Sequence, residues 1–543
     1  AQVRMVTEGE MVEMLSGELG KRHRLVRAGG VRQLGEVRIS RYHFRHNLFH
    51  KYLYGNLDPV ERAYLHEAVG MKLETLYQDQ IEEIAVHLAR HFQEAGILDK
   101  ALEYYKQAGD SAARVYAHTE AISHYSHAIH LANQLRLSGE TLTLLYTNLG
   151  RSLELNSQYD QALNAYEEME RWAIQYSDLA MELASLVNRV TILSVPTAVH
   201  DPIRALDLGE RALDLADALG DQEAKAKILW SLSLANYLSK RVRQAIDYGE
   251  SSLLLARQLS LREQTAQTLN DLGGFIYLYN GQLDQVKETL KEASSLWRQL
   301  GNIPMLADSL GGLCVAHVYA GEFDRAIALS EETFQISHSI GNVWGQSYSQ
   351  WAVGEAFGEL GEFSRAIKAM EECVHLGELA GFLAAQTYTR SKLAQVYADL
   401  GDLGTAIELV QVVQDLTEKH DYRVDTAVTM GVLAHLQVLN GELGEAQITI
   451  DKMKYDVFHE SWAIFQLPVL FAEVELACCS GNYQHALRVT EDLLTRLRQY
   501  GMHLMIPEAL YQQGSVLSGL GQDEAAGERF LEAQVVAESI GSR

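Results

Sequence analysis

The chain contains little cysteine, little proline and no long apolar run. Four of its 543 residues are cysteine and six are proline. The cysteines (Cys314, Cys373, Cys478, Cys479) show no metal-ligand spacing, which is typical of packed thiols in a reducing, cytoplasmic setting. The scarcity of proline and the lack of a Ser/Gly-rich tract argue against flexible linkers and disorder. There is no run of about eighteen apolar residues and no signal-peptide pattern, so we expect no association with membranes.

Basic residues are also in the minority. The sequence holds 46 Lys and Arg against 72 Asp and Glu, which gives a formal net charge of −26. Residues 1–60 hold 10 basic and 6 acidic residues, so the remainder holds 36 basic and 66 acidic ones. A surface this acidic repels a phosphate backbone. We therefore predict that the part of the chain beyond residue 60 does not bind nucleic acid.

The sequence motifs of common catalytic sites are missing as well. Leu19-Gly20-Lys21-Arg22 lacks both the upstream glycine and the hydroxyl residue of a phosphate-binding loop. The sequence has no Gly-x-Ser-x-Gly, no His-Glu-x-x-His and no Cys-x-x-Cys. His87 and His91 stand four residues apart, but no third metal ligand stands near them. These absences predict a chain with no catalytic residue, no metal and no cofactor of its own.

What the sequence does contain is a repeat with a period of 40 residues. Seven glycines keep this spacing, and each begins the phrase Gly-x-x-x-x-Ala/Val: Gly281, Gly321, Gly361, Gly401, Gly441, Gly481 and Gly521. A fixed period of this length is the mark of a solenoid, in which each unit buries its apolar face against its neighbours.

One repeat unit, residues 307–346, shows two helices and two turns. Its apolar residues recur at helical spacing on both sides of Gly321, a residue type that readily ends a helix. We expect Asp324 to cap the second helix, which ends at Gly341-Asn342. Looser copies continue toward the N-terminus, with one irregular turn around Pro196 and Pro202. The pattern predicts an all-α solenoid of about eleven helical pairs from residue 80 onward.

The repeat phrase resembles the tetratricopeptide repeat. The match is carried by Gly354, Phe357, Gly361 and Ala366, in a unit lengthened from the family's period of about 34 residues to 40. The resemblance implies a right-handed superhelix over residues 136–543. Residues 58–135 are expected to form a helical connector and the first degenerate repeats.

Residues 1–57 follow a different pattern. A helix is predicted at 10–19, two strands at 25–28 and 37–44, and a second helix at 47–54. Asp58-Pro59 has the residue types that begin another helix. Helix, β-wing and helix together predict a small, partial winged-helix segment.

The string from Tyr42 to Tyr54, followed by Arg62 and Leu65-His66, resembles the end of the nucleotide-switch module of STAND-type signalling ATPases. The resemblance implies an upstream nucleotide-binding domain as a partner, with ATP or ADP bound by that domain of the parent protein. It also implies a nucleotide-sensing role for Arg45, His46 and Asn47, although Asn47 stands where the family has Asp. Alternatively, His46 caps the wing against its own helix. A start at Ala1 rather than Met suggests a fragment of a longer protein.

In tetratricopeptide superhelices the first helix of each pair lines the concave groove. Transferring the groove positions to this sequence selects Lys227, Trp230, Tyr237, Asn270, Tyr277, Tyr348, Trp351, Glu355, Tyr388, Gln395 and His435. Aromatic rings beside amides and carboxylates suit recognition of a peptide or a polar small molecule. Trp351 and Tyr348 are the strongest candidates, and we expect Trp351→Ala to leave the fold intact. Alternatively, rings such as Tyr277 only fill gaps between repeats.

Three functions fit this sequence. The first is the non-catalytic sensor arm of a STAND-type ATPase, which binds a protein, peptide or small-molecule inducer in the groove. The second is a free-standing scaffold for protein–protein interaction. The third is the regulatory part of a protein with an upstream cyclase or kinase domain. Phe44-Arg45-His46 and the predicted wing favour the first and third over the second.

Overall fold

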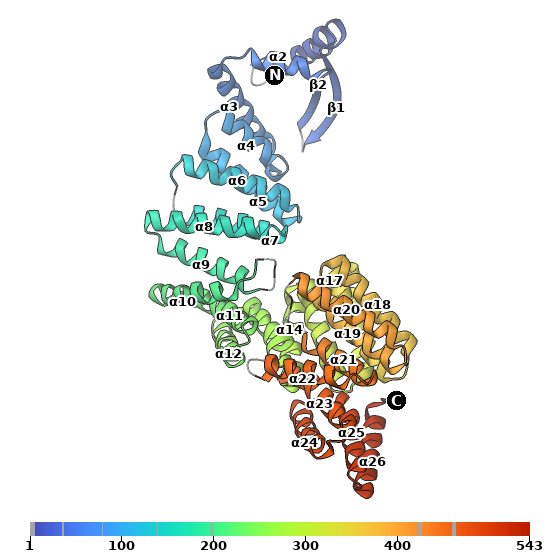
Figure 1. The fold of residues 1–543 in the computed structure, drawn as a ribbon. Coiled ribbons are helices and arrows are strands. Elements are labelled where there is room, and N and C mark those ends of the chain that lie inside the picture. The colour runs from blue at the N-terminus through green and yellow to red at the C-terminus, as the bar shows by residue number, and fades with distance from the viewer. Residues whose placement is uncertain are drawn as a thin grey trace. The chain divides into compact units, whose positions relative to one another are not determined.

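The structure, a computed structural model, is dominated by antiparallel helices that follow one another along the chain (Figure 1). It describes residues 6–34, 37–78, 80–137, 139–195, 197, 199–420, 422, 426–458 and 463–542. The chain divides into two compact units. Unit 1 comprises Ala1–His200 with Asp214–Leu219, and unit 2 comprises Asp201–Leu213 with Gly220–Arg543. The domain boundaries predicted after residues 57 and 135 remain predictions.

Unit 1 begins with a short helical segment and a β-hairpin. Its first elements are α1 (Glu8–Glu13), the π-helix η2 (Met14–Arg22), β1 (Val26–Leu34), β2 (Val37–Phe44) and α2 (Asn47–Gly55). The strands pair antiparallel, with Val26 opposite Phe44 and a bulge between Ala28 and Gly30. The two predicted strands therefore form one hairpin. The winged-helix assignment of the whole segment remains a prediction.

The rest of unit 1 is a stack of helices. It contains α3 (Pro59–Leu76), the 3₁₀ helix η3 (Ile81–Ile84), α4 (Ala85–Glu94), α5 (Leu98–Arg114), α6 (His118–Gln134), α7 (Glu140–Leu155), α8 (Tyr159–Tyr176) and α9 (Leu179–Ser194). Asp58 caps α3 by accepting from the backbone N–H of Val60 and Glu61, both at 2.9 Å. A chain of side chains joins α2 to α3 and α4: the Tyr54 hydroxyl lies 2.9 Å from His66 Nε2, and His66 Nδ1 lies 2.9 Å from His91 Nδ1.

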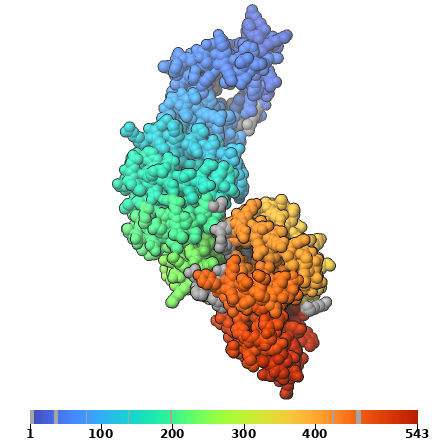
Figure 2. Space-filling model, viewed as in Figure 1, coloured from blue at the N-terminus to red at the C-terminus, as the bar shows by residue number. Residues whose placement is uncertain are grey.

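Unit 2 continues the pairs to the end of the described chain. Its helices are α10 (Pro202–Leu219, shared with unit 1), α11 (Gln222–Leu238), α12 (Val242–Gln258), α13 (Arg262–Asp271) with the π-helix η4 (Leu272–Tyr277), α14 (Leu283–Leu300), α15 (Ile303–Tyr319), α16 (Phe323–Ser339), α17 (Val343–Glu359), α18 (Phe363–Ala380), α19 (Leu383–Asp399), α20 (Leu403–His420), α21 (Thr426–Leu439), α22 (Leu443–Phe458), η5 (Ala463–Phe465) with α23 (Gln466–Cys479), α24 (Tyr483–Tyr500), η6 (His503–Met505) with α25 (Ile506–Gly519), and α26 (Asp523–Ile540). Figure 2 shows the yellow, orange and red segments of this unit in continuous contact.

The prediction of about eleven helical pairs is confirmed for the described residues. In chain order they are α4 with α5 and the ten successive pairs from α7 with α8 to α25 with α26, with α6 between them. No helix in the ranges that the structure describes is long and apolar enough to cross a membrane. Of the two prolines in the predicted irregular turn, Pro202 begins α10, and Pro196 lies outside the described residues.

The glycine of each repeat ends the first helix of its pair. Gly321 has φ +72°, and the N–H of Glu322 donates to the carbonyl oxygen of His317 over 2.8 Å. This geometry satisfies carbonyl groups that a helix end leaves unpaired. The prediction that Asp324 caps the next helix is wrong, because α16 begins at Phe323 and Glu322 holds the cap position. As the second residue of α16, Asp324 only adds favourable charge to its N-terminus.

The first helices of consecutive pairs form a layer of their own in unit 2. Contacts join α15 to α17, α17 to α19, α19 to α21, α21 to α23 and α23 to α25. In a curved array, elements on the shorter, inner arc touch one another. We call the side of unit 2 formed by these helices the inner face.

The tight packing around Gly150, a helical glycine of unit 1, predicts that a larger residue at this position lowers the stability of the fold. A Cβ atom on Gly150 of α7 would lie 2.2 Å from the ring of Tyr166, which is buried. We expect Gly150→Ala to lower the free energy of unfolding by about 1–3 kcal/mol because the core becomes overpacked. Urea denaturation measures this change.

The control is Gly527→Ala in α26, where an added Cβ meets nothing within 4 Å. This variant is expected to raise the stability by roughly 0.5–1 kcal/mol, the usual gain from Gly to Ala inside a helix. Equal effects of the two substitutions would contradict the packing described for Gly150.

Candidate functional site

A buried polar cluster joins α11, α13 and α15 of unit 2. Trp230 Nε1 donates to Asp271 Oδ2 over 2.7 Å. Asn270 Nδ2 donates to Asp271 Oδ1 over 3.1 Å and to Asp308 Oδ2 over 2.7 Å. The pKa of Asp308 is raised to about 6: burial is the main cause, the hydrogen bond from Asn270 opposes it, and the charge of Asp271 adds to it. Because one amide serves two carboxyl groups on different helices, this cluster fixes how three successive repeats stack.

An aromatic cluster follows on α17 and α19. Trp351 lies with ring centroids 5.8 Å from Tyr348, 5.8 Å from Phe382 and 4.9 Å from Tyr388. Only 9% of Trp351 is exposed. The rings pack against one another, so this part of the inner face is filled with side chains.

The hydroxyl group of Tyr388 extends this cluster into a network of charged groups. It donates to Glu355 Oε1 over 2.8 Å, and Lys392 Nζ lies 3.0 Å from Glu355 Oε2. Since its one proton goes to Glu355, Tyr388 accepts from Tyr319, whose hydroxyl lies 2.8 Å away. Burial acts to lower the pKa of Lys392, but the charge of Glu355 outweighs this and raises it. Lys392 and Glu355 therefore form an ionised pair.

Further carboxyl groups follow on the inner face; we call Glu355, Glu359, Asp399, Glu475 and Glu508 the acidic row. His435 Nδ1 lies 2.8 Å from Glu475 Oε1. Two other carboxyl groups of the row accept hydrogen bonds from uncharged side chains. Gln395 Nε2 donates to Asp399 Oδ1 and Ser542 Oγ donates to Glu359 Oε2, both over 2.9 Å.

The carboxyl groups of the acidic row hold protons more tightly than isolated ones. Glu508 is accessible to solvent, yet its pKa is raised to about 7, mainly by loss of hydration among the surrounding groups. The charges of Glu359 and Asp399 contribute to this rise, and those of Lys392 and His435 oppose it. Burial also raises the pKa values of Glu359 and Asp399. Burial acts to lower the pKa of His435, but Glu475 outweighs it, so that His435 carries positive charge more readily than a free histidine.

The structure brings several of the predicted groove residues together. Tyr348, Trp351, Glu355 and Tyr388 meet in the aromatic cluster and its charged network. Trp230 and Asn270 share Asp271, while Gln395 and His435 serve the acidic row.

The remaining predicted groove residues make other contacts. The Tyr277 hydroxyl donates to Glu250 of α12 over 3.0 Å, so its ring fills the space between neighbouring helices. Tyr237 packs against Phe275 and Tyr279, and Lys227 is half-buried on α11.

Several polar groups of the inner face were missed by the sequence prediction: Asp271, Asp308, Glu359, Lys392, Asp399, Glu475 and Glu508. The 40-residue period held a signal for at least two of them. Glu355, Gln395, His435 and Glu475 occupy one position in four consecutive repeats, and Tyr348, Tyr388 and Glu508 share another. Aligning polar residues by period, instead of searching for aromatic ones, finds Glu475 and Glu508.

The predicted nucleotide-sensing residues lie at the start of α2. His46 is the N-cap residue, and its Nδ1 accepts from the N–H of Leu48 over 3.3 Å. Arg45 Nε donates to the carbonyl oxygen of Val26 over 3.2 Å, and Asn47 is the first residue of the helix. Capping, the alternative role for His46, is therefore present. A nucleotide-sensing role for the three residues remains a prediction.

His91 pairs with His66, and no metal-binding group of three or more ligands occurs among the described residues.

Antiparallel helix pairs, with a left-handed glycine between the two helices of each pair from α13 and α14 to α25 and α26, define a tetratricopeptide-type α-solenoid. The sequence model of one family of this class, the MalT-like TPR region, matches residues 226–541. The chain belongs to this family.

Solved structures with the same kind of fold have very different sequences. A Rap protein complexed with competence and sporulation factor is 10% identical and has a TM-score of 0.50; the alignment covers 67% of this chain and 98% of that one. The apo quorum sensor NprR from B. thuringiensis is 13% identical, with a TM-score of 0.41 and coverages of 66% and 99%. A STAND protein with a tetratricopeptide repeat sensor from Pyrococcus horikoshii is 12% identical, with a TM-score of 0.39 and coverages of 61% and 51%. No curated protein sequence matches the chain.

The burial of Trp351 corrects the expectation that Trp351→Ala leaves the fold intact. Removing a buried indole from among three rings leaves a cavity, so we expect a loss of about 3–5 kcal/mol in the free energy of unfolding. Urea denaturation of unit 2 measures it. Tyr511→Ala, at a side chain that is 62% exposed, is the control and is expected to cost less than about 1 kcal/mol. A loss as small for Trp351 as for Tyr511 would contradict the aromatic packing.

The raised pKa of Glu508 predicts a pH-dependent stability. The folded protein binds this proton more tightly than the unfolded chain, whose carboxyl titrates near 4.5, so the stability gained from the proton disappears as the pH rises from about 4.5 to about 7. Glu508→Gln removes this loss. We expect its melting temperature to exceed that of the wild type at about pH 8 and the difference to shrink toward about pH 5.

The matched control is Glu371→Gln on the exposed side of α18. Melting curves at several pH values give the comparison. A difference between Glu508→Gln and the wild type that is the same at every pH would contradict the raised pKa.

Proposed function

We propose that unit 2 is a non-catalytic sensor that binds a positively charged peptide, or a polar small molecule with a cationic group, on its inner face. We further propose that the chain is the sensor arm of a STAND-type ATPase whose nucleotide-binding domain is its partner. Membership of the MalT-like family supports a binding role for the repeats. The resemblance of residues 42–66 to the end of a STAND nucleotide switch supports the second part.

The observation that carries the proposal is the charge of the acidic row. Glu355 is paired with Lys392 and Glu475 with His435, whereas Glu359 and Asp399 receive hydrogen bonds from uncharged groups. Glu508 adds a carboxyl group whose pKa these neighbours help to raise. A cation brought among these groups is attracted by negative charge in an environment that screens it less than water does.

The neighbouring aromatic cluster supports the acidic row and does not itself face a ligand. Trp351 and Tyr388 are only 9% and 6% exposed, because their rings pack against each other. The hydroxyl group of Tyr388 links the cluster to the row by donating to Glu355. The carboxyl groups are therefore the groups that meet the charged head of a Lys or Arg side chain of the ligand.

A sensor must bind its ligand more tightly in one conformation than in another. The inner face meets this requirement because it is built from residues of α17, α19, α21, α23 and α25. A ligand that contacts several of these helices favours the curvature that places its contacts correctly. Binding energy is thereby converted into a change in the shape of unit 2.

A panel of short peptides tests the proposed function. Peptides of equal length that carry Lys and Arg, Asp and Glu, or only uncharged residues are added to the protein, and the melting temperature is followed. We expect the basic peptides to raise it, since a ligand that binds the folded state stabilises it. The rise is expected to be larger at about pH 8 than at about pH 6, because Glu508 loses its proton in between.

Two variants test whether the basic peptides bind on the inner face. Asp399→Asn combined with Glu508→Gln is expected to reduce the rise caused by basic peptides, and Glu371→Gln on α18 is expected to leave it unchanged. Equal shifts from basic and acidic peptides would overturn the proposed charge preference. An equal reduction by both variants would place binding away from the inner face.

A further inference from the structure

Unit 2 makes contact with itself between segments that lie far apart in the sequence. Tyr500, at the end of α24, packs against the turn at Gly281, and Ile540, at the end of α26, packs against the turn at Gly321. Both partners advance by the same 40 residues, so one superhelical turn meets the next in register. We call Tyr500, Ile540 and Ser542, with the residues they contact, the clasp.

The glycine turns are shaped to receive these side chains. A Cβ atom on Gly281 would lie 2.6 Å from the Tyr500 ring, and one on Gly321 would lie 2.7 Å from Ile540. Either distance is shorter than a real Cβ contact allows. At Gly441, which has the same left-handed backbone and ends the first helix of its own pair, an added Cβ meets nothing within 4 Å. Gly281 and Gly321 therefore end their helices and also leave the space that Tyr500 and Ile540 occupy.

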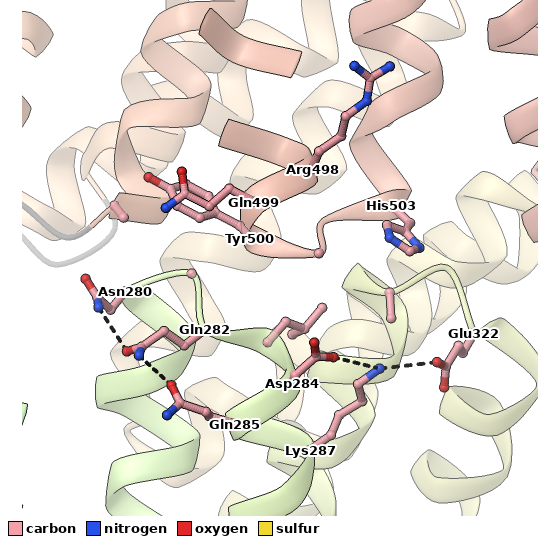
Figure 3. A pocket seen from close by; sticks show the side chains of 15 residues that line it. Asn280, Gln282, Asp284, Gln285, Lys287, Glu322, Arg498, Gln499, Tyr500 and His503 are labelled. Carbon is pink, nitrogen blue, oxygen red and sulfur yellow. Dashed lines mark hydrogen bonds and ion pairs between the residues drawn. The ribbon is translucent and has the colours of Figure 1, made fainter. Parts of the chain in front are cut away.

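The clasp borders a polar pocket, and the ion pairs described here around this pocket each lie within one of its walls. The pocket, with a volume of about 620 Å³, lies between the turn around Gly281 and the segment around Gly501. In Figure 3, Gln499 and Tyr500 face Asn280 and Gln282 across it. The ion pairs drawn there stay on one wall: Lys287 Nζ lies 3.3 Å from Glu322 Oε1 and 4.0 Å from Asp284 Oδ1. On the other wall, Arg498 pairs with Glu532 of α26 over 2.9 Å.

The clasp is also connected to the acidic row. Ser542 Oγ, two residues beyond Ile540, donates to Glu359 Oε2 over 2.9 Å. Glu359 is one of the carboxyl groups whose charge raises the pKa of Glu508. The end of α26 thus holds a group of the inner face.

We propose that the clasp opens while the helix pairs on both sides remain folded, and that opening releases Glu359 of the acidic row from Ser542 and gives access to it. Each wall keeps its own ion pairs and turn hydrogen bonds when the walls separate. Opening breaks the Ser542 hydrogen bond and the apolar contacts between the walls, among them Tyr279 with Phe465 and α15 with η6. Local opening of this kind requires less free energy than global unfolding. That opening controls ligand entry rests on the proposed function; the opening itself does not.

Hydrogen–deuterium exchange of the full chain tests the opening. Gly321→Ala and Gly441→Ala place the same residue in turns with φ +72° and +76°, so both carry similar backbone strain, and only the first clashes across the clasp. We expect Gly321→Ala to speed exchange in residues 499–542 by about tenfold relative to Gly441→Ala. Ile540→Ala, which removes the contact without touching a glycine, is expected to act in the same direction.

Access to the inner face is measured on the same proteins by carbodiimide labelling of carboxyl groups with glycine ethyl ester. Ile540→Ala is expected to increase labelling of Glu359 and to leave that of Glu371 unchanged. Equal exchange in Gly321→Ala and Gly441→Ala, or Glu359 labelling that Ile540→Ala does not change, would overturn the clasp. If the clasp opens but basic peptides do not bind, the proposed function fails and the clasp stands.

Discussion

The structure of unit 2 depends on the left-handed glycine that ends the first helix in seven consecutive repeats, from Gly281 to Gly521. A non-glycine residue rarely adopts this conformation, because its Cβ collides with the backbone. Repeating it every 40 residues gives each pair a similar turn, and similar turns add up to a curve with the first helices inside. The inner face, the alignment of its polar side chains and the meeting of one superhelical turn with the next all follow from this repetition.

The inner face combines groups that stabilise the array with groups that leave charge unbalanced. Asn270 and its two carboxyl partners link three helices, and the aromatic cluster around Trp351 fills space that a wider superhelix would leave open. The acidic row lies next to these supports, and two of its members also hold the structure together: Glu355 accepts from Tyr388, and Glu359 accepts from Ser542. Its carboxyl groups weaken one another's ionisation, which is a cost to folding that binding of a cation would remove.

Much of the fold could be predicted from the sequence, because the glycine period and the helical spacing of apolar residues are local signals. The pairs, their turns and the β-hairpin follow from such signals. The curvature of the array, by contrast, depends on contacts between residues that lie far apart in the sequence. No residue near Gly281 indicates that Tyr500 packs on it, so the sequence suggested an open groove where unit 2 instead makes contact with itself. For the same reason Trp351, expected to be free for a ligand, is buried against rings from the next repeat.

The central claim is that the inner face of unit 2 is the binding surface. The most direct measurement is the change in hydrogen exchange of unit 2 when a basic peptide that raises its melting temperature is added. The account predicts slower exchange in the inner helices α17, α19, α21, α23 and α25, and little change in the outer helices α16, α18, α20 and α22. Protection confined to the outer helices, or to unit 1, would contradict it.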